Sequence, residues 1–256
     1  MSTIDQLERE IEAEFLDETR DVLSGLEVML GNVESGLVDA AQAVLRLRKS
    51  FLALEARSQS LDNAGLAILA HRAFDFCSDL SELNRERVAD VQVFIDVIRR
   101  LMDEGGDKAA SAELVRQLPC RHIVDFDVAE AAKKTNIEVL LVVPDRATSH
   151  YVERELAACG YRLSNARSFF RGLEAAVRTK PDLVIGAAVL DDASGIDLAR
   201  ALAGISATAN TPYALLTSFE PGHPPLAELP ASAAVVRKGT NFGEDIANAL
   251  AHFKIT

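Results

Sequence analysis

The sequence predicts a chain of the α plus α/β class, in which an antiparallel helical bundle precedes a five-stranded parallel α/β sandwich. Residues 1–104 contain no proline and show only helical spacing of apolar residues. Residues 137–254 alternate short apolar runs with helical patterns, which indicates a parallel sheet covered by helices. The length of 256 residues fits two small domains, at about 150 residues per domain.

Four amphipathic helices are expected in the first segment, over residues 4–36, 39–54, 64–83 and 88–104. Asp39 is a good N-cap residue for the second helix, and Gly36 suits the C-terminal end of the first. Amphipathic helices with short connections pack as an antiparallel bundle, so residues 1–104 are expected to form one domain.

A change of pattern marks the linker. Glycines at 105 and 106, polar residues and Pro119 interrupt the periodicity of residues 105–136, which predicts a linker with one short helix near Ala112–Gln117. The second domain is then expected over residues 137–254. Its strands are predicted at Ile137–Val143, Tyr161–Ala166, Asp182–Val189, Tyr213–Thr217 and Ala233–Val236, with helices over residues 149–159, 169–179, 195–202 and 242–253.

Composition and charge exclude several functions. Hydrophobic residues make up 48% and charged residues 26%, an ordinary globular balance. The net charge of −12 makes nucleic acid and anionic membranes poor partners, and we expect neither. No apolar run reaches the ~20 residues of a membrane span, and the first residues lack a signal-peptide pattern, so a cytoplasmic location is expected. Cys77 and Cys159 fall in apolar helical patterns and are expected to be buried.

The segments VLLVVPD at 139–145, PDLVIGAAV at 181–189, TPYALLTS at 211–218 and VVRKG at 235–239 resemble, in order, the receiver domain of response regulators. The resemblance implies a flavodoxin-like fold. In receivers, an Asp at the end of the third strand accepts a phosphoryl group, and acidic residues after the first strand hold Mg²⁺. A Thr or Ser after strand four and a Lys after strand five bind the phosphoryl oxygens.

The receiver pattern is degenerate at the positions that carry this chemistry. Ala187 occupies the phospho-acceptor position and supplies no nucleophile, and Pro144-Asp145 leaves one acid of the pair. Thr217 and Lys238 are retained. The resemblance therefore implies a pseudo-receiver with no metal ion and no cofactor. The helix that usually follows strand four is expected to be lost, because proline breaks helices. The prolines of this segment are Pro221, Pro224, Pro225 and Pro230.

The segments at 14–36 (EFLDETRDVLSGLEVMLGNVESG) and 45–74 (LRLRKSFLALEARSQSLDNAGLAILAHRAF) are similar to histidine phosphotransfer (HPt) domains. That family accepts a phosphoryl group on a His followed by Lys and Gly. Here Lys49, Leu52 and Ala53 occupy those three positions, so the bundle is an HPt-like domain without the acceptor. His71 is the single histidine of the bundle.

A basic cluster of Arg46, Arg48 and Lys49 surrounds the phosphotransfer position. Arg46 and Lys49 are three residues apart and share a helix face. The cluster is either an ordinary solvated face or a docking point for an acidic receiver pocket or a partner's helix.

Together these patterns imply a non-enzymatic signalling protein, an adaptor or scaffold in a two-component, phosphorelay or chemotaxis-like pathway. Its expected partners are histidine kinases, HPt proteins or receiver proteins, with self-association left open. The alternative is an active phosphotransfer protein that uses His71, Asp191 or Asp192 as an unorthodox acceptor. An α/β enzyme is disfavoured, because the sequence has no glycine-rich phosphate loop and no GxSxG motif.

Overall fold

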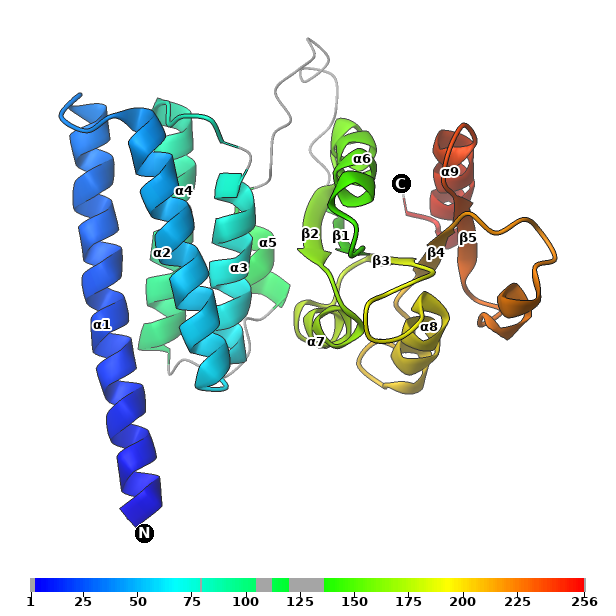
Figure 1. The fold of residues 1–256 in the computed structure, drawn as a ribbon, viewed down its shortest axis with the longest axis horizontal. Helices are drawn as coiled ribbons and strands as arrows, with labels where there is room; N and C mark the ends of the chain where they lie inside the picture. Colours follow the sequence, from blue (N-terminus) through cyan, green and yellow to red (C-terminus); the bar gives the residue numbers. More distant parts are fainter. Residues whose placement is uncertain (1–2, 79, 105–111, 120–135, 256) are drawn as a thin grey trace. The chain divides into compact units, whose positions relative to one another are not determined.

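A computed structural model describes residues 3–78, 80–104, 112–119 and 136–255 (Figure 1). The chain divides into two compact units, Met1–Pro119 and Cys120–Thr256, and each has its own apolar core. Of the linker expected over residues 105–136, residues 105–111 and 120–135 lie outside the described residues. No described helix is long and apolar enough to cross a membrane.

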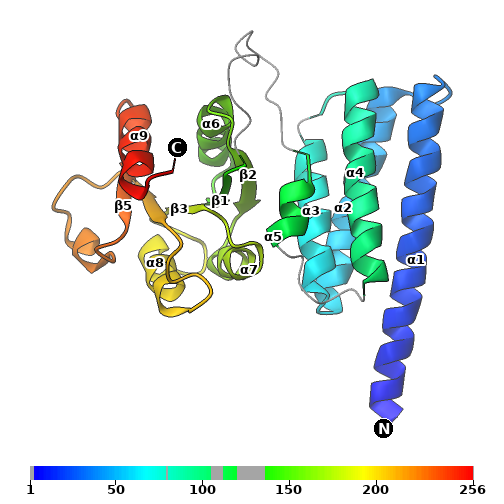
Figure 2. The same cartoon turned by 180° about the vertical axis from the view of Figure 1, so that it is seen from behind.

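The first unit is helical, as the sequence predicts. In the bundle, α1 packs against α2 and α4, and α3 packs against the same two helices (Figures 1 and 2). The four helices therefore enclose one core. The elements are α1 (Thr3–Glu34), α2 (Ala40–Ser60), α3 (Ala64–Ser78), α4 (Arg85–Asp103) and the short α5 (Ala112–Gln117).

Side-chain caps set the limits of the bundle helices. The Asp39 carboxylate accepts a hydrogen bond from the backbone N–H of Gln42 at 2.8 Å, and Asn84 accepts one from Arg87 at the start of α4. These bonds satisfy N–H groups that have no partner inside the helix. Gly36 has a φ of 70° just after α1, a conformation that favours glycine. The expected N-cap at Asp39 is confirmed.

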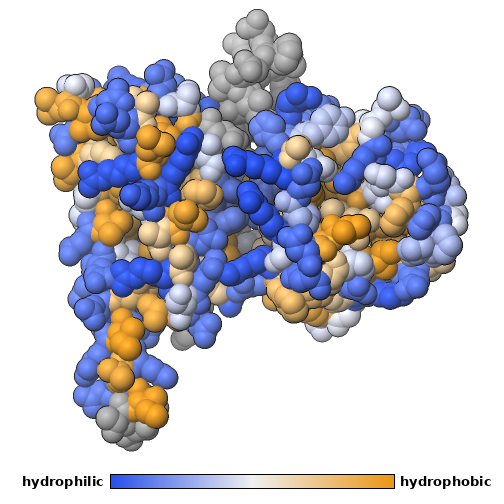
Figure 3. Space-filling view, in the orientation of Figure 1, coloured by the Kyte–Doolittle hydropathy of each residue, from blue (hydrophilic) through white to orange (hydrophobic). Residues whose placement is uncertain are grey.

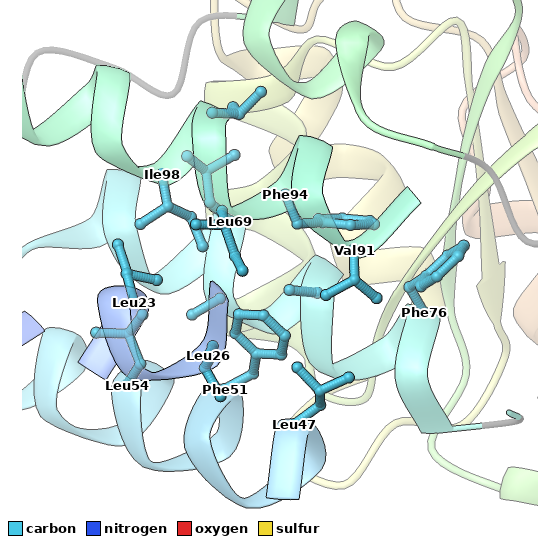
Figure 4. Close-up of a cluster of buried hydrophobic side chains, with 14 of the residues drawn as sticks. Leu23, Leu26, Leu47, Phe51, Leu54, Leu69, Phe76, Val91, Phe94 and Ile98 are labelled. Carbon is cyan, nitrogen blue, oxygen red and sulfur yellow. The ribbon is translucent and has the colours of Figure 1, made fainter. Parts of the chain in front are cut away.

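The core of the bundle is filled by large aliphatic and aromatic side chains from all four long helices (Figure 4). Leu114, Val115 and Leu118, in and just after α5, are also buried in this core. The first unit therefore extends to Pro119 rather than to residue 104, because the short helix of the expected linker packs as part of the bundle. The labelled core residues are Leu23, Leu26, Leu47, Phe51, Leu54, Leu69, Phe76, Val91, Phe94 and Ile98.

The second unit contains one five-stranded sheet with all strands parallel, in the order β2-β1-β3-β4-β5. This is the strand order of flavodoxin-like doubly wound domains, so the predicted fold class is confirmed. The strands are β1 (Glu138–Val142), β2 (Arg162–Ala166), β3 (Leu183–Ala187), β4 (Tyr213–Thr217) and β5 (Ala234–Arg237). The helices are α6 (Arg146–Ala158), α7 (Phe169–Thr179), α8 (Gly195–Gly204) and α9 (Phe242–Phe253).

Two glycines allow α8 to pack closely on the sheet. The Tyr213 hydroxyl donates a 2.7 Å hydrogen bond to the Gly195 carbonyl, and a Cβ at Gly186 would lie 2.0 Å from that hydroxyl. A Cβ at Gly195 would lie 2.2 Å from the Ala187 carbonyl oxygen. Any larger residue at these positions would push β3 away from its neighbours.

Three local expectations can be compared with the structure. The proline-rich segment after β4 forms only the short 3₁₀ helix η1 (Pro224–Glu228), so the predicted loss of an α-helix is confirmed. Cys77 is buried in the bundle, as expected. The expected burial of Cys159 is wrong, because this residue is the C-cap of α6 and faces solvent.

Candidate functional site

The positions singled out by the receiver resemblance lie at the carboxyl ends of the strands. Pro144 and Asp145 follow β1, Ala187 ends β3, Thr217 ends β4, and Lys238 follows β5. Parallel strands end at the same edge of their sheet, so the topology gathers these residues there. Ligands of open α/β sheets bind at this edge, which makes it the candidate site of the second unit.

Asp145 serves as the N-cap of α6. Its carboxylate accepts a 2.7 Å hydrogen bond from the Thr148 backbone N–H. Hydrogen bonds from the Thr148 side chain and backbone lower the pKa of Asp145, and the positive charge of Lys238 lowers it further. Asp145 is therefore an ionised carboxylate at neutral pH, held in place by the first turn of a helix.

The position that the receiver resemblance assigns to the phospho-acceptor holds a buried methyl group. Ala187 is only 4% exposed, and its carbonyl faces the start of α8 at Gly195. Pro144, in place of the second acid, is half-buried. This part of the edge offers neither a nucleophile nor an oxygen ligand from a side chain.

Thr217 and Lys238 are adjacent at the ends of β4 and β5. The Lys238 backbone N–H donates to the Thr217 carbonyl at 2.9 Å. The buried Thr217 hydroxyl accepts a 3.0 Å hydrogen bond from the Phe219 N–H, which closes the turn after β4. The Lys238 side chain is exposed and remains available to an anion.

The two acids of the β3–α8 loop differ in role. Asp192 accepts a 2.8 Å hydrogen bond from the backbone N–H of Phe169, the first residue of α7, and so ties the loop to that helix. Asp191 is exposed. Across the described residues, no group of three or more His, Cys, Asp or Glu side chains is placed to hold a metal ion.

A cavity of about 240 Å³ lies beside the carboxyl ends of β4 and β5. Its walls are mainly apolar and aromatic, and the rings of Tyr151 and Phe242 meet edge-to-face with centroids 5.3 Å apart. No sequence pattern marks this cavity, because it depends on how α6 and α9 meet the sheet. The lining residues are Ala147, Thr148, Tyr151, Val152, Leu216, Lys238, Gly239 and Phe242.

An ion pair near this edge also went unpredicted. The Arg237 guanidinium donates to both carboxylate oxygens of Asp245, at 2.8 and 2.9 Å, and its backbone N–H donates to the same carboxylate. Hydrogen bonds from Arg237 lower the pKa of Asp245. The pair fastens α9 to β5. An acid eight residues after an arginine gives no sequence signal, because the contact depends on the turn between them.

In the bundle, two residues of the basic cluster face solvent and the third forms hydrogen bonds within the bundle. Arg46 and Lys49 are exposed on α2. Arg48 instead turns toward α3 and donates three hydrogen bonds of 2.7–2.9 Å, to the carbonyls of Cys77, Ser78 and Leu80. Arg48 therefore caps the end of a helix, and the two alternatives left open by the sequence, a solvated face or a docking point, now concern Arg46 and Lys49 only.

His71 lies between two carboxylates. Its Nδ1 is 3.2 Å from Glu55 of α2, and its Nε2 is 3.7 Å from Asp75, one turn further along α3. The side chain is one-third exposed. Both ring nitrogens thus face carboxylates, whose negative charge opposes the approach of an anionic phosphoryl donor.

The strand order and parallel pairing define the second unit as a flavodoxin-like domain. No family model matches the chain, and no curated protein matches it.

Solved structures similar to this chain include receiver domains. A chemotaxis response regulator of Vibrio cholerae is 22% identical with a TM-score of 0.41. The receiver domain of a Pseudomonas aeruginosa sensor histidine kinase, with a coordinated magnesium ion, is 17% identical with a TM-score of 0.42. The activated N-terminal receiver domain of RstA from Klebsiella pneumoniae is 25% identical with a TM-score of 0.41. Each match covers 46% of this chain and 98% of the similar chain.

Proposed function

We propose that this protein is a non-catalytic adaptor or scaffold of a two-component or chemotaxis-like signalling pathway. The observation that carries the proposal is which residues lie at the carboxyl ends of the strands. Asp145, Thr217 and Lys238 hold the positions of a receiver pocket, while Ala187 removes the nucleophile from its centre. The domain keeps a receiver's shape without its acceptor.

The chemistry of phosphoryl transfer supports a non-catalytic role for the second unit. Transfer to a carboxylate needs a nucleophilic oxygen, and a divalent cation to offset the charge of the transferring group. The methyl group of Ala187 supplies no oxygen, and Asp145 is occupied as a helix cap. On this proposal the second unit transmits information through binding alone.

The unorthodox acceptors are less suited to the task. Asp192 already accepts the N–H of Phe169, and His71 is flanked by Glu55 and Asp75. A phosphoryl group on His71 would add negative charge beside two carboxylates, which is a repulsive like-charge contact. Exposed Asp191 remains the acceptor to exclude by experiment.

The proposed partners are other two-component proteins, namely histidine kinases, HPt proteins or receiver proteins. Arg46 and Lys49 on α2 give the bundle a basic face in a unit that is otherwise acidic. Such a face suits an acidic surface of a partner, and its charges set the rate and specificity of encounter.

The proposal is tested by incubating the full chain with acetyl phosphate and Mg²⁺ and measuring its intact mass. The expected result is no change in mass. The matched comparison is Ala187→Asp, which places a carboxylate at the vacant position. A gain of one phosphoryl group in the wild type, lost in Asp191→Asn, Asp192→Asn or His71→Gln, would overturn the proposal and identify the acceptor.

A further inference from the structure

The first helix is longer than the bundle that it packs against. α1 has 32 residues, against 21 in α2 and 19 in α4. Its N-terminal part runs past the ends of both neighbours in the two opposite views (Figures 1 and 2). A helical segment without tertiary packing is marginally stable in water, so this protruding end gains from a binding surface.

The protruding end carries an apolar stripe. Ile4, Leu7 and Ile11 are 66%, 57% and 43% exposed, and hydrophobic side chains follow this end of the helix in Figure 3. Their spacing of three and four residues places them on one face. The same stripe continues into Phe15, which is buried in the bundle core. The exposed stripe is therefore a continuation of a packing surface.

Acidic residues are frequent in the same stretch of sequence. Residues 4–14 contain five acids and one arginine, a net charge of −4. Two such ends would repel each other if they were paired side by side, whereas a basic surface with apolar residues would complement them. The five acids are Asp5, Glu8, Glu10, Glu12 and Glu14.

The outward face of α2 is apolar and basic, which complements the apolar and acidic end of α1. Leu45 and Leu52 are 62% and 50% exposed, with Lys49 between them and Arg46 alongside. Neither Arg46 nor Lys49 forms an ion pair within the described part of the chain. Leu45 and Leu52 are seven residues apart, as are Ile4 and Ile11. Seven residues of helix span about 10.5 Å, so the two apolar rows have equal length.

We propose that the acidic, apolar end of α1 in one copy of this chain binds the basic, apolar face of α2 in a second copy. Contact within one chain is excluded, because the end of α1 is continuous with the part that packs in the core and would have to break to reach its own α2 face. The apolar rows supply the buried surface, and the charges fix orientation and partner. The inference uses the same Arg46 and Lys49 face as the proposed partner binding, but its test is self-association and does not depend on the phosphorylation test of the proposed function.

The first experiment measures molar mass by light scattering over a range of concentrations of the full chain. The mass is expected to rise above the 27.7 kDa of a single chain as concentration increases. Leu7→Glu should weaken association at least tenfold. Val28→Glu is the matched control, since Val28 is an equally exposed apolar residue of α1 outside the stripe, and its mass should follow the wild type. A mass of 27.7 kDa at every concentration would overturn the proposal.

The second experiment exchanges the charges. Glu8→Lys/Glu10→Lys/Glu12→Lys turns the net charge of residues 4–14 from −4 to +2. This variant and Arg46→Glu/Lys49→Glu should each lose self-association, because each brings like charges together. An equimolar mixture should associate again, since each end of α1 then meets an α2 face of opposite charge. If Arg46→Glu/Lys49→Glu alone associates like the wild type while Leu7→Glu does not, two ends of α1 pair with each other and the α2 assignment is wrong.

Discussion

Arg46 and Arg48 lie two residues apart in α2, and the sequence gives no means of telling them apart. Side chains two residues apart in a helix point in directions that differ by about 200°. Arg46 and Arg48 therefore face different surroundings and cannot bind the same group. Arg46 faces solvent, whereas Arg48 crosses to α3 and satisfies three carbonyls at and just beyond its end. Such carbonyls have no partner inside their own helix. A charge cluster in sequence can therefore combine a binding residue with a structural one.

This difference predicts that Arg48→Ala lowers the free energy of unfolding by about 2 kcal/mol, since hydrogen bonds from a charged group to partly buried carbonyls are lost. Arg46→Ala should change the stability by no more than about 0.5 kcal/mol, as is usual for an exposed residue. Urea unfolding of both variants measures this. Equal losses of stability would show that Arg48 does not hold the end of α3.

At the scale of elements, the sequence predicted most limits to within one residue, while the ends of α2 at Ser60 and of α3 at Ser78 differ from the predicted 54 and 83. Limits that depend on a local cap are the ones that a sequence can predict. The helix over Phe169–Thr179 begins after Ser168, whose side chain accepts the N–H of Arg171, and the predicted limits of this helix match those observed. α6 begins at Arg146 rather than at residue 149, because Asp145 caps it. A pattern of apolar residues locates the middle of a helix, whereas the capping bond fixes its first turn.

The contact between β3, β4 and α8 gives a prediction about packing. Gly186→Ala should destabilise the second unit by about 2 kcal/mol, because the new Cβ meets the Tyr213 hydroxyl and forces an already filled region apart. Thermal unfolding of the full chain, followed by circular dichroism, measures the effect. Tyr213→Phe should recover part of this loss in the double variant, since the clashing oxygen is removed. If the double variant shows only the sum of the two single losses, another contact limits the space.

The pair that fastens α9 to β5 gives a prediction about pH. The pKa of Asp245 is lowered in the folded protein by its hydrogen bonds with Arg237. A lowered folded pKa stabilises the protein above the unfolded pKa, and this stabilisation is lost as pH falls through the folded value. Asp245→Asn should therefore lower the melting temperature at pH 7, and the difference from the wild type should shrink in acid below the ordinary carboxyl pKa of 3.8. Glu244→Gln, at the exposed neighbouring position, is the control. A difference that is constant with pH would mean that the variant acts through packing instead.

For the whole molecule, the sequence located the candidate edge of the sheet but not the cavity beside it. The strand pattern placed Asp145, Ala187, Thr217 and Lys238 at strand ends, and parallel pairing brought these ends to one edge. The cavity beneath Tyr151 could not be predicted, because it depends on the distance between two helices that are far apart in sequence. Periodicity reports which face of an element is apolar, and tertiary packing decides what that face meets.

The limit of the first unit is the clearest case in which packing overrides pattern. Residues 112–118 follow a glycine pair and look like part of a linker, yet Leu114, Val115 and Leu118 are buried in the core of the bundle. A fragment of residues 1–104 would leave that apolar surface open to water, at a cost of about 1.5–3 kcal/mol for each buried side chain before the entropy of ordering is counted. A fragment of residues 1–119 should therefore unfold at a clearly higher temperature than residues 1–104. Circular dichroism melts of the two fragments measure this, with Leu114→Ser/Leu118→Ser in the longer fragment expected to reproduce the lower melting temperature. Identical melts for residues 1–104 and 1–119 would show that α5 adds nothing to the bundle, and that the domain ends with α4.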